Sequence, residues 1–261
     1  MAEYNEIYAR ATYYDIALGR DVTREVVFVR DLFAKLAGRE LGSVLEIACG
    51  PAYHARAFAR LGVEAHGLDL RPEMIAFARD RANEDGVTVD LFAADMRAFR
   101  MARPMDAIVT MYDGIDCLLT QDELIDHFRT VGENLARDGL YLLELTHPRD
   151  TGFAEYGSFS YAGKRGGTEV EVRWAVNEPS HDPATMVAEV DVEMRIRENG
   201  QERVVRDRAR ERMYTAPEIV ALARLSGKLK VTHYFGDFRL DQPLDYSEGA
   251  RRMILVLRPT G

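Results

Sequence analysis

The feature of this sequence that most constrains its fold is an alternation of strand-like and helix-like segments over the first 150 residues. Five short apolar segments have the length of β-strands, at 43–47, 63–68, 87–92, 107–111 and 140–145. Segments with helical periodicity separate them, and Thr120 to Glu123 has the sequence of a capping box at a helix start. Strands that alternate with helices form parallel βαβ units. The pattern therefore predicts an α/β fold with a doubly wound sheet, whose ligand binds at the carboxyl ends of the strands.

The pattern changes after residue 148 to alternating apolar and polar residues. Residues 169–176 and 190–196 alternate in this way, and Asn199-Gly200 is a strong signal for a two-residue hairpin turn. Pairing about that turn places three acids opposite three arginines, in the pairs Glu193–Arg206, Asp191–Arg208 and Glu189–Arg210. We therefore interpret the arginines as a solvated, ion-paired face rather than a phosphate site. Residues 150–214 are predicted to form an antiparallel insertion of about three strands.

The alternation of helix and strand resumes at residue 215. Thr215 to Glu218 has the sequence of a second capping box, and residues 229–235 and 252–257 have the pattern of two further strands. These strands complete a predicted seven-stranded, mostly parallel sheet formed by residues 1–149 and 215–261. Because no long polar linker sets the insertion apart, we expect it to belong to the same folding unit.

Composition and charge narrow the range of partners. The chain has a formal net charge of −9 and a pI near 5.3, whereas nucleic-acid binders normally present a basic face. Its longest apolar run, residues 253–257, is far shorter than the ~20 residues of a membrane span. Cys49 and Cys117 allow at most one disulfide, and the first residues lack the pattern of a signal peptide. We therefore expect reduced thiols and a cytoplasmic protein that binds neither nucleic acid nor membrane.

Residues 44–54 form the most informative segment, because a strand, a turn of small residues and a helix start follow one another. Gly50 is the single glycine of this turn, so the glycine pattern alone is weak. Glu46 stands at the end of the strand, where its carboxylate would repel a pyrophosphate and attract a ligand with a sulfonium and an ammonium group. S-adenosylmethionine is such a ligand, and we favour it over a dinucleotide.

Two further acids follow the next two predicted strands. Asp69 ends the second strand, 19 residues after Gly50, where a carboxylate accepts hydrogen bonds from ribose hydroxyls. Asp95 and Met96 follow the third strand, where a carboxylate accepts from an adenine amino group and a thioether packs on the ring. Each acid alone is as readily a helix cap or a turn former. Three acids at one edge of one sheet make a cofactor site the better interpretation.

These segments resemble the class I S-adenosylmethionine-dependent methyltransferases, whose sheet is Rossmann-like. Residues 46–52 resemble the first motif of that family, residues 67–79 its second, and residues 93–99 its adenine-binding segment. Further similarity to the family lies at 111–119 and 138–144. The ending, at 234–238 and 252–256, resembles the small-molecule branch, which carries a β insertion after the fifth strand. Enzymes that methylate the nitrogen of sarcosine and of amino sugars share that layout. Alanines at 48 and 52 replace usual glycines, and residue 116 is aspartate where relatives often have asparagine.

The resemblance implies a set of cofactor contacts. The backbone of the turn would hold the methionine part, Met111 would offer its carbonyl to the ammonium group, and Arg20 would pair with the carboxylate, although a surface salt bridge explains Arg20 equally well. The N-terminal helices within residues 1–38 resemble a flap, in which a ring or phenol of Tyr8, Tyr13 or Tyr14 would help to hold the sulfonium or the amine. Plain helix packing is the alternative for these tyrosines. The implied cofactor-binding residues are Tyr14, Arg20, Glu46, Ala48, Cys49, Gly50, Pro51, Asp69, Leu70, Met74, Asp95, Met96 and Met111.

The expected reaction is methylation of a small-molecule acceptor, on nitrogen rather than on oxygen. Tyr14, Asp113 and Asp116 are the candidate catalytic residues, because acids after the fourth strand would attract a cationic amine. No cysteine–histidine cluster has metal-ligand spacing, so we expect no metal. The alternatives are an O-methyltransferase, a non-catalytic cofactor-binding protein and a nicotinamide oxidoreductase. The insertion is expected to cover the site as a lid or to form the contact of a homodimer.

Overall fold

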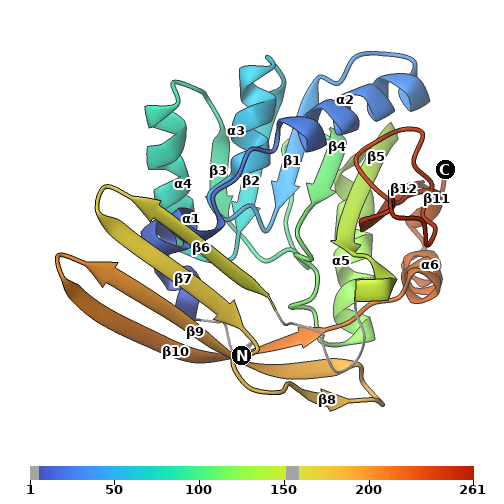
Figure 1. The fold of residues 1–261 in the computed structure, drawn as a ribbon. Helices are drawn as coiled ribbons and strands as arrows, with labels where there is room; N and C mark the ends of the chain where they lie inside the picture. Colours follow the sequence, from blue (N-terminus) through green and yellow to red (C-terminus); the bar gives the residue numbers. More distant parts are fainter. Residues whose placement is uncertain (1–5, 151–158) are drawn as a thin grey trace.

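The computed structural model describes residues 6–150 and 159–261, which form two β-sheets and the helices that cover them (Figure 1). The strands of the larger sheet are β1 (Ser43–Ile47), β2 (Glu64–Asp69), β3 (Asp90–Ala93), β4 (Met105–Thr110), β5 (Leu135–Thr146), β11 (Leu229–Phe235) and β12 (Arg252–Pro259). Their order is β11-β12-β5-β4-β1-β2-β3. Strand β12 runs antiparallel to both neighbours, and the other pairs are parallel. The predicted doubly wound, mostly parallel sheet is confirmed.

Helices cover both faces of this sheet, because each has an apolar side that must be buried. They are α2 (Thr23–Ala37), α3 (Tyr53–Arg60), α4 (Pro72–Glu84), α5 (Gln121–Asn134) and α6 (Ala216–Leu225), preceded by the N-terminal 3-10 helix η1 (Glu6–Ala9) and by α1 (Ala11–Leu18). One hydrophobic core joins the sheet to α2, α3 and α4, and another joins it to α5 and α6. Among the described residues, no helix has both the length and the apolar character that a membrane span requires.

The two predicted capping boxes have different outcomes. At the start of α5, the Thr120 hydroxyl accepts the Glu123 backbone N–H at 3.2 Å, and the Glu123 carboxylate accepts the Thr120 N–H at 3.1 Å. At the start of α6, the Thr215 hydroxyl accepts the Glu218 N–H at 3.4 Å. The Glu218 carboxylate, however, accepts from the guanidinium of Arg212 at 2.6 Å. The first box is confirmed, and the second is a one-sided cap because Arg212 occupies the carboxylate.

The second sheet is antiparallel and lies in sequence between β5 and α6. Its strands are β6 (Ser160–Arg165), β7 (Thr168–Trp174), β8 (Ser180–Asp182), β9 (Val187–Glu198) and β10 (Gln201–Arg212). The order is β10-β9-β7-β6, with β8 paired to β9, so the prediction of about three strands is wrong. Strand β6 is largely exposed and β8 has three residues, so neither carries the apolar alternation that identifies a strand. Residues 151–158 of the predicted insertion lie outside the described residues.

The predicted register between β9 and β10 is confirmed. Three acids of β9 lie opposite three arginines of β10, in the pairs Glu193–Arg206, Asp191–Arg208 and Glu189–Arg210. Their closest side-chain N···O distances are 2.9, 3.1 and 3.7 Å. Because side chains alternate along a strand, residues 207, 209 and 211 of β10 point to the other face of the sheet.

The apolar face of the second sheet is buried against the N-terminal segment of the same chain. Ile7 of η1 and Leu18 of α1 belong to the hydrophobic core that β7, β9 and β10 share. At Gly163 of β6 the approach is so close that an added Cβ would lie 1.7 Å from the backbone oxygen of Ile16. The second sheet and α1 lie beyond the carboxyl ends of the parallel strands, where the sequence predicts the ligand (Figure 1).

Candidate functional site at the carboxyl edge of the sheet

The turn after β1 brings bare backbone to the carboxyl edge of the sheet. Ala48, Gly50 and Ala52 all have positive φ values, of 52°, 51° and 57°. An alanine rarely adopts this left-handed conformation, so the two alanines take the shape that glycine takes without strain. The Cys49 N–H donates to the backbone oxygen of Leu68 at 2.9 Å, which fixes the turn to β2. None of these three residues carries a side chain larger than a methyl group.

Asp69 is held at the end of β2 with both of its carboxylate oxygens toward the turn. One oxygen accepts the Gly50 N–H at 2.9 Å, and the other accepts the Arg71 N–H at 3.0 Å. Burial raises the pKa of Asp69, and the two backbone hydrogen bonds act in the opposite direction. A carboxylate oxygen accepts more than one hydrogen bond, so each oxygen retains capacity for a further donor such as a hydroxyl group.

Glu46 lies beneath the turn rather than beside an open edge. Its side chain is buried, with one oxygen 2.8 Å from His54 Nδ1 and the other accepting the Ala55 N–H at 2.8 Å. An anion at the first turn of a helix is stabilised by the N–H groups and the dipole there. Glu46 therefore secures the start of α3 against β1, and its contact with a cofactor stays a prediction.

Asp95 is at the expected edge but already has a cationic partner. It accepts the Arg97 backbone N–H at 2.8 Å and the Arg97 guanidinium at 2.6 Å. These bonds hold the pKa of Asp95 below its usual range, against the opposing effect of burial. Arg97 also donates to Glu123 at 2.6 Å, and the Met96 carbonyl accepts from His127 Nδ1 at 3.0 Å. The adenine contact predicted for Asp95 and Met96 stays a prediction.

The remaining cofactor candidates differ in exposure. Cys49, Pro51, Met74 and Met111 are buried, whereas Leu70 is 37% exposed. The Met111 carbonyl, expected to bind an ammonium group, accepts the Gly114 N–H at 3.2 Å. Its second lone pair remains available, because a carbonyl oxygen accepts two hydrogen bonds. Cys49 and Cys117 are both free thiols, as expected.

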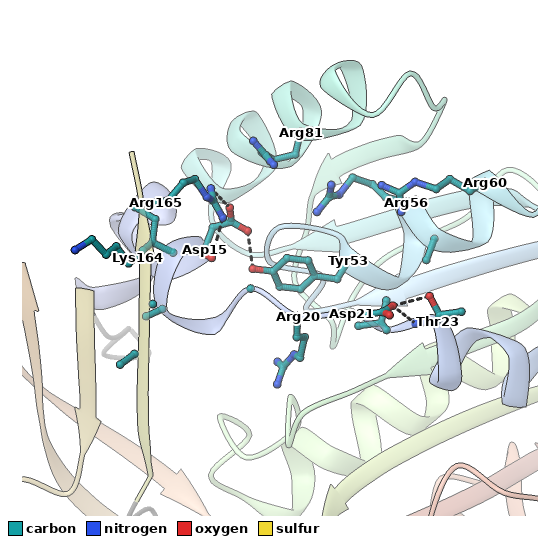
Figure 2. Close-up of a pocket in the computed structure, with 17 residues that line it drawn as sticks. Asp15, Arg20, Asp21, Thr23, Tyr53, Arg56, Arg60, Arg81, Lys164 and Arg165 are labelled. Carbon is teal, nitrogen blue, oxygen red and sulfur yellow. Dashed lines mark hydrogen bonds and ion pairs between the residues drawn. The ribbon is translucent and has the colours of Figure 1, made fainter. Parts of the chain in front are cut away.

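Arg20 follows α1 and covers the ring of Tyr112, which comes directly after Met111. Its Nε is buried and has no hydrogen-bond partner. Figure 2 shows its side chain pointing away from Arg56 and Arg60 of α3. A buried guanidinium N–H without an acceptor is costly, so this atom calls for an anionic group such as a carboxylate.

A separate cavity of about 500 Å³ lies on the other side of this segment, between α1, α3, α4 and β6 (Figure 2). Asp15 projects into it, accepting the Tyr53 hydroxyl at 2.6 Å and the Arg165 guanidinium at 2.7 Å. Arg56 and Arg60 both pair with Asp85. Arg20 also lines this cavity. Because Arg56, Arg60 and Arg165 are ion-paired and Asp69 does not line the cavity, we do not assign the cofactor to it. The Asp15 contacts instead tie α1 to α3 and to β6.

The candidate catalytic aspartates are less free than the sequence suggests. The Asp113 carboxylate accepts the Thr146 hydroxyl and the Arg252 guanidinium, each at 2.9 Å. Asp116 is buried, and its backbone oxygen accepts the Arg212 N–H at 2.8 Å. An ion pair with Arg252 offsets the negative charge expected to attract an amine, so electrostatic attraction by Asp113 is weaker than predicted.

Tyr14 belongs to an aromatic cluster between α1 and the second sheet. Its ring centroid lies 5.4 Å from that of Tyr8, and the Tyr8 ring lies 6.2 Å from that of Trp174 in β7. Burial raises the pKa of Tyr14 to about 12, while the charge of Arg20 acts against it. Tyr14 is therefore a neutral phenol at neutral pH, able to donate a hydrogen bond but not to act as a strong base.

Sequence reasoning missed Glu211 of β10. Its carboxylate accepts the Trp174 indole N–H at 2.7 Å. The pKa of Glu211 is raised to about 7, chiefly by burial and also by the charge of Asp113, while the hydrogen bond from Trp174 acts in the opposite direction. The signal was present in the sequence: once the arginines of β10 are placed on the solvated face, the acid at 211 falls on the inner face.

Comparisons with known proteins agree with this architecture. Residues 44–139 match the family described as "Methyltransferase domain". The dTDP-3-amino-3,4,6-trideoxy-alpha-D-glucopyranose N,N-dimethyltransferase of Streptomyces venezuelae is 30% identical over 51% of this chain and 56% of its own length. A related N,N-dimethyltransferase of Streptomyces fradiae, acting on a dTDP-3-amino-3,6-dideoxy sugar, is 31% identical over 51% of this chain and 52% of its own. The chain thus spans about half the length of these curated relatives.

Solved structures extend the likeness to the whole fold. An S-adenosylmethionine-dependent methyltransferase from Clostridium acetobutylicum has a TM-score of 0.77 at 15% identity and covers 97% of this chain and 98% of its own. DesVI of Streptomyces venezuelae has a TM-score of 0.74 at 22% identity and covers 98% of this chain and 99% of its own. Together these findings show that residues 44–139 match a methyltransferase domain and that the chain has the fold of the class I S-adenosylmethionine-dependent methyltransferases.

Proposed function

We propose that this protein uses S-adenosylmethionine to methylate the nitrogen of a small-molecule amine. The observation that carries the proposal is Asp69, a half-buried carboxylate that two backbone N–H groups hold at the end of β2, beside a turn of small residues. Three of the curated relatives that match this chain are named as N,N-dimethyltransferases of amino sugars, which supports nitrogen as the acceptor atom. An amino sugar is therefore the first acceptor class to test.

The residues present fit S-adenosylmethionine. The unpartnered Arg20 Nε calls for an anionic group, which the methionine carboxylate provides. Asp69 has acceptor capacity for the ribose hydroxyls, and the backbone at Ala48 to Gly50 leaves room for the methionine part. When bound, the cofactor supplies an electrophilic methyl group on a sulfonium.

The chain itself contributes positioning and exclusion of water. Methyl transfer needs a nucleophile in line with the methyl group, so holding the amine in place supplies a large part of the rate enhancement. The neutral phenols of Tyr8 and Tyr14 and the indole of Trp174 form a largely apolar wall opposite Asp69. Such a wall removes the hydration shell of an amine and strengthens nearby electrostatic interactions. We also propose that residues 150–214 act as a lid over this site, and sedimentation would test the predicted homodimer.

Calorimetric titration with S-adenosylhomocysteine tests the cofactor assignment. We expect micromolar binding, weakened by about 1–3 kcal/mol in Asp69→Ala because the ribose hydroxyls lose their acceptor. Asp90→Ala is the matched control, because that exposed aspartate begins β3 at the opposite edge of the sheet. Tighter binding of NAD than of S-adenosylhomocysteine would contradict the assignment.

Incubation with methyl-labelled cofactor tests the acceptor. A dTDP-linked 3-amino sugar is expected to take up the label, and a catechol is expected not to. The catechol arm is included because ubiquinone biosynthesis O-methyltransferases also match part of this chain, at 34% identity over 32% of it. Labelling of the catechol alone would overturn methylation on nitrogen, and cofactor binding without any transfer would indicate a non-catalytic protein.

A further inference from the structure

We propose that Glu211, with the rings of Trp174 and Tyr8, forms the site that takes the ammonium group of the acceptor, and that the Glu211 carboxylate receives its proton. The inference rests on the proposed N-methylation and assigns to it an acid from the second sheet. Of the candidate catalytic residues identified from the sequence, Asp113 is paired with Arg252 and Tyr14 is a neutral phenol.

The geometry places Glu211 on the inner face of the second sheet. Three arginines of β10, at positions 206, 208 and 210, lie on the other face, paired with acids of β9, whereas Arg203 lies over the ring of Tyr13. One Glu211 oxygen accepts the Trp174 indole N–H at 2.7 Å, which fixes the carboxylate against the ring. Tyr8 packs on the same indole, with ring centroids 6.2 Å apart, and Tyr14 packs on Tyr8. A carboxylate bordered by aromatic faces suits a cationic amine, because both attract positive charge.

The charged groups around Glu211 leave it as a weak base near neutral pH. Burial raises its pKa to about 7, the Trp174 hydrogen bond lowers it, and the charge of Asp113 raises it. Tyr8 from η1 stays protonated, because burial, followed by Tyr14 and then Glu211, raises its pKa well above the usual value. A base with a pKa near the working pH is suited to accept a proton from an amine.

The transfer of the proton and of the methyl group conserves atoms and charge. The ammonium N–H bond breaks and its proton passes to a Glu211 oxygen, leaving a neutral amine with a free electron pair. That pair forms the new N–C bond to the methyl group as the S–C bond breaks, and the sulfur keeps the bonding pair. The charge that leaves the sulfonium appears on the methylated nitrogen. A second round requires loss of a proton from that nitrogen, and Glu211 can accept it after releasing the first to solvent.

Tryptophan fluorescence tests this site without the cofactor, because Trp174 is the single tryptophan of the chain and donates to Glu211. We expect a pH-dependent change in emission with a midpoint near 7, absent in Glu211→Gln. Glu189→Gln is the matched control, since Glu189 lies on the solvated face of the same sheet. A transition that persists unchanged in Glu211→Gln would overturn the assignment.

Binding of a probe amine tests the preference for positive charge. At pH 8, cyclohexylammonium is expected to change the Trp174 emission at a concentration at least tenfold lower than cyclohexanol. Glu211→Gln is expected to remove this preference, and Glu189→Gln to retain it. Equal binding of the two probes by the unmodified protein would overturn the amine site.

Turnover separates this inference from the proposed function. Glu211→Gln is expected to lower kcat for an amino-sugar acceptor at least 100-fold, to remove the rise in rate near pH 7, and to leave S-adenosylhomocysteine binding within twofold. Unchanged kcat with an unchanged pH profile would overturn the role of Glu211 as proton acceptor. An unmodified protein that prefers cyclohexylammonium but labels no amine would support the amine site and overturn the proposed function.

Discussion

The edge of the larger sheet and the facing second sheet contribute to the candidate site in different ways. At the sheet edge, the backbone N–H groups of Gly50 and Arg71 hold Asp69. The turn after β1 carries only small side chains. The second sheet contributes side chains instead, with Trp174 and Glu211 on its inner face and Tyr8 packed against them. The first arrangement comes from one contiguous motif, and the second from three segments that are distant in sequence. The difference indicates that local structure fixes the residues proposed to bind the cofactor. The residues proposed to bind the acceptor depend instead on how the second sheet packs against the N-terminal segment.

Gly163→Ala is expected to have the largest effect, because it separates the second sheet from α1. The added methyl group would lie 1.7 Å from the Ile16 backbone oxygen, and neither backbone can move without breaking its packing. We expect a loss of more than about 3 kcal/mol of unfolding free energy, measured by urea denaturation. The exposed neighbour Ala162→Ser should stay within about 0.5 kcal/mol of the unmodified protein. Equal midpoints for all three proteins would show that the docking contact is not needed.

Glu211 should make the free energy of unfolding depend on pH. The pKa of Glu211 is raised from 4.5 to about 7, so the folded chain holds this proton more tightly than the unfolded chain. Stability is therefore lost as the pH rises from 4.5 to 7. Glu211→Gln removes that loss, and we expect its advantage over the unmodified protein to grow to about 3 kcal/mol across this range. Urea titrations at several pH values would measure the difference, and a constant difference would contradict it.

The larger sheet should show the opposite dependence through His127. Burial lowers the pKa of this imidazole from 6.5 to about 4, with Nδ1 donating to the Met96 carbonyl and Nε2 2.9 Å from the Tyr141 hydroxyl. Below pH 6.5, His127 becomes protonated in the unfolded chain but stays neutral in the folded chain. The free energy of unfolding therefore decreases as the pH falls from 6.5 to 4. His127→Gln should remove up to about 3 kcal/mol of this dependence. The same urea titrations measure it, and an unchanged slope would refute the assignment.

Ala48→Gly, in the turn after β1, should have the smallest effect on the free energy of unfolding. Glycine relieves the cost of a positive φ but gains entropy in the unfolded chain, so we expect a net stabilisation of about 0.5 kcal/mol. Ala57→Gly, within α3, is the matched control and should cost about 1 kcal/mol. Thermal unfolding of both variants measures the contrast, and a destabilised Ala48→Gly would argue that the methyl group has a packing role.

The sequence predicts those parts of the molecule in which each residue responds to its immediate neighbours along the chain. The register of β9 and β10 follows from alternating charges about Asn199-Gly200, and the position of Asp69 follows from the strand before it. The partner of a charged side chain is harder to predict even when it is close in the sequence, because it depends on side-chain rotamers. Glu218 turns from its cap to Arg212, and Asp95 turns to Arg97 only two residues away.

Glu211 shows the same limit for the candidate site. Its strand and its face follow from the sequence pattern, but its environment does not. The carboxylate lies against Trp174, from β7, and against Tyr8, which is more than 200 residues earlier in the chain. No sequence periodicity reports such a contact, because periodicity reports only which face of an element is apolar.

The burial of the second sheet against α1 also sets an order of events during synthesis. The core that contains Ile7 and Leu18 is completed by β9 and β10, which end at Arg212. At translation rates of roughly 5–20 residues per second, the N-terminal helix waits about 10–40 s for those strands to emerge. Until then its apolar residues stay exposed, and its contacts close a very long loop. Helix α1 is thus made well before the strands that bury its apolar residues, and the nascent chain is open to aggregation during that interval.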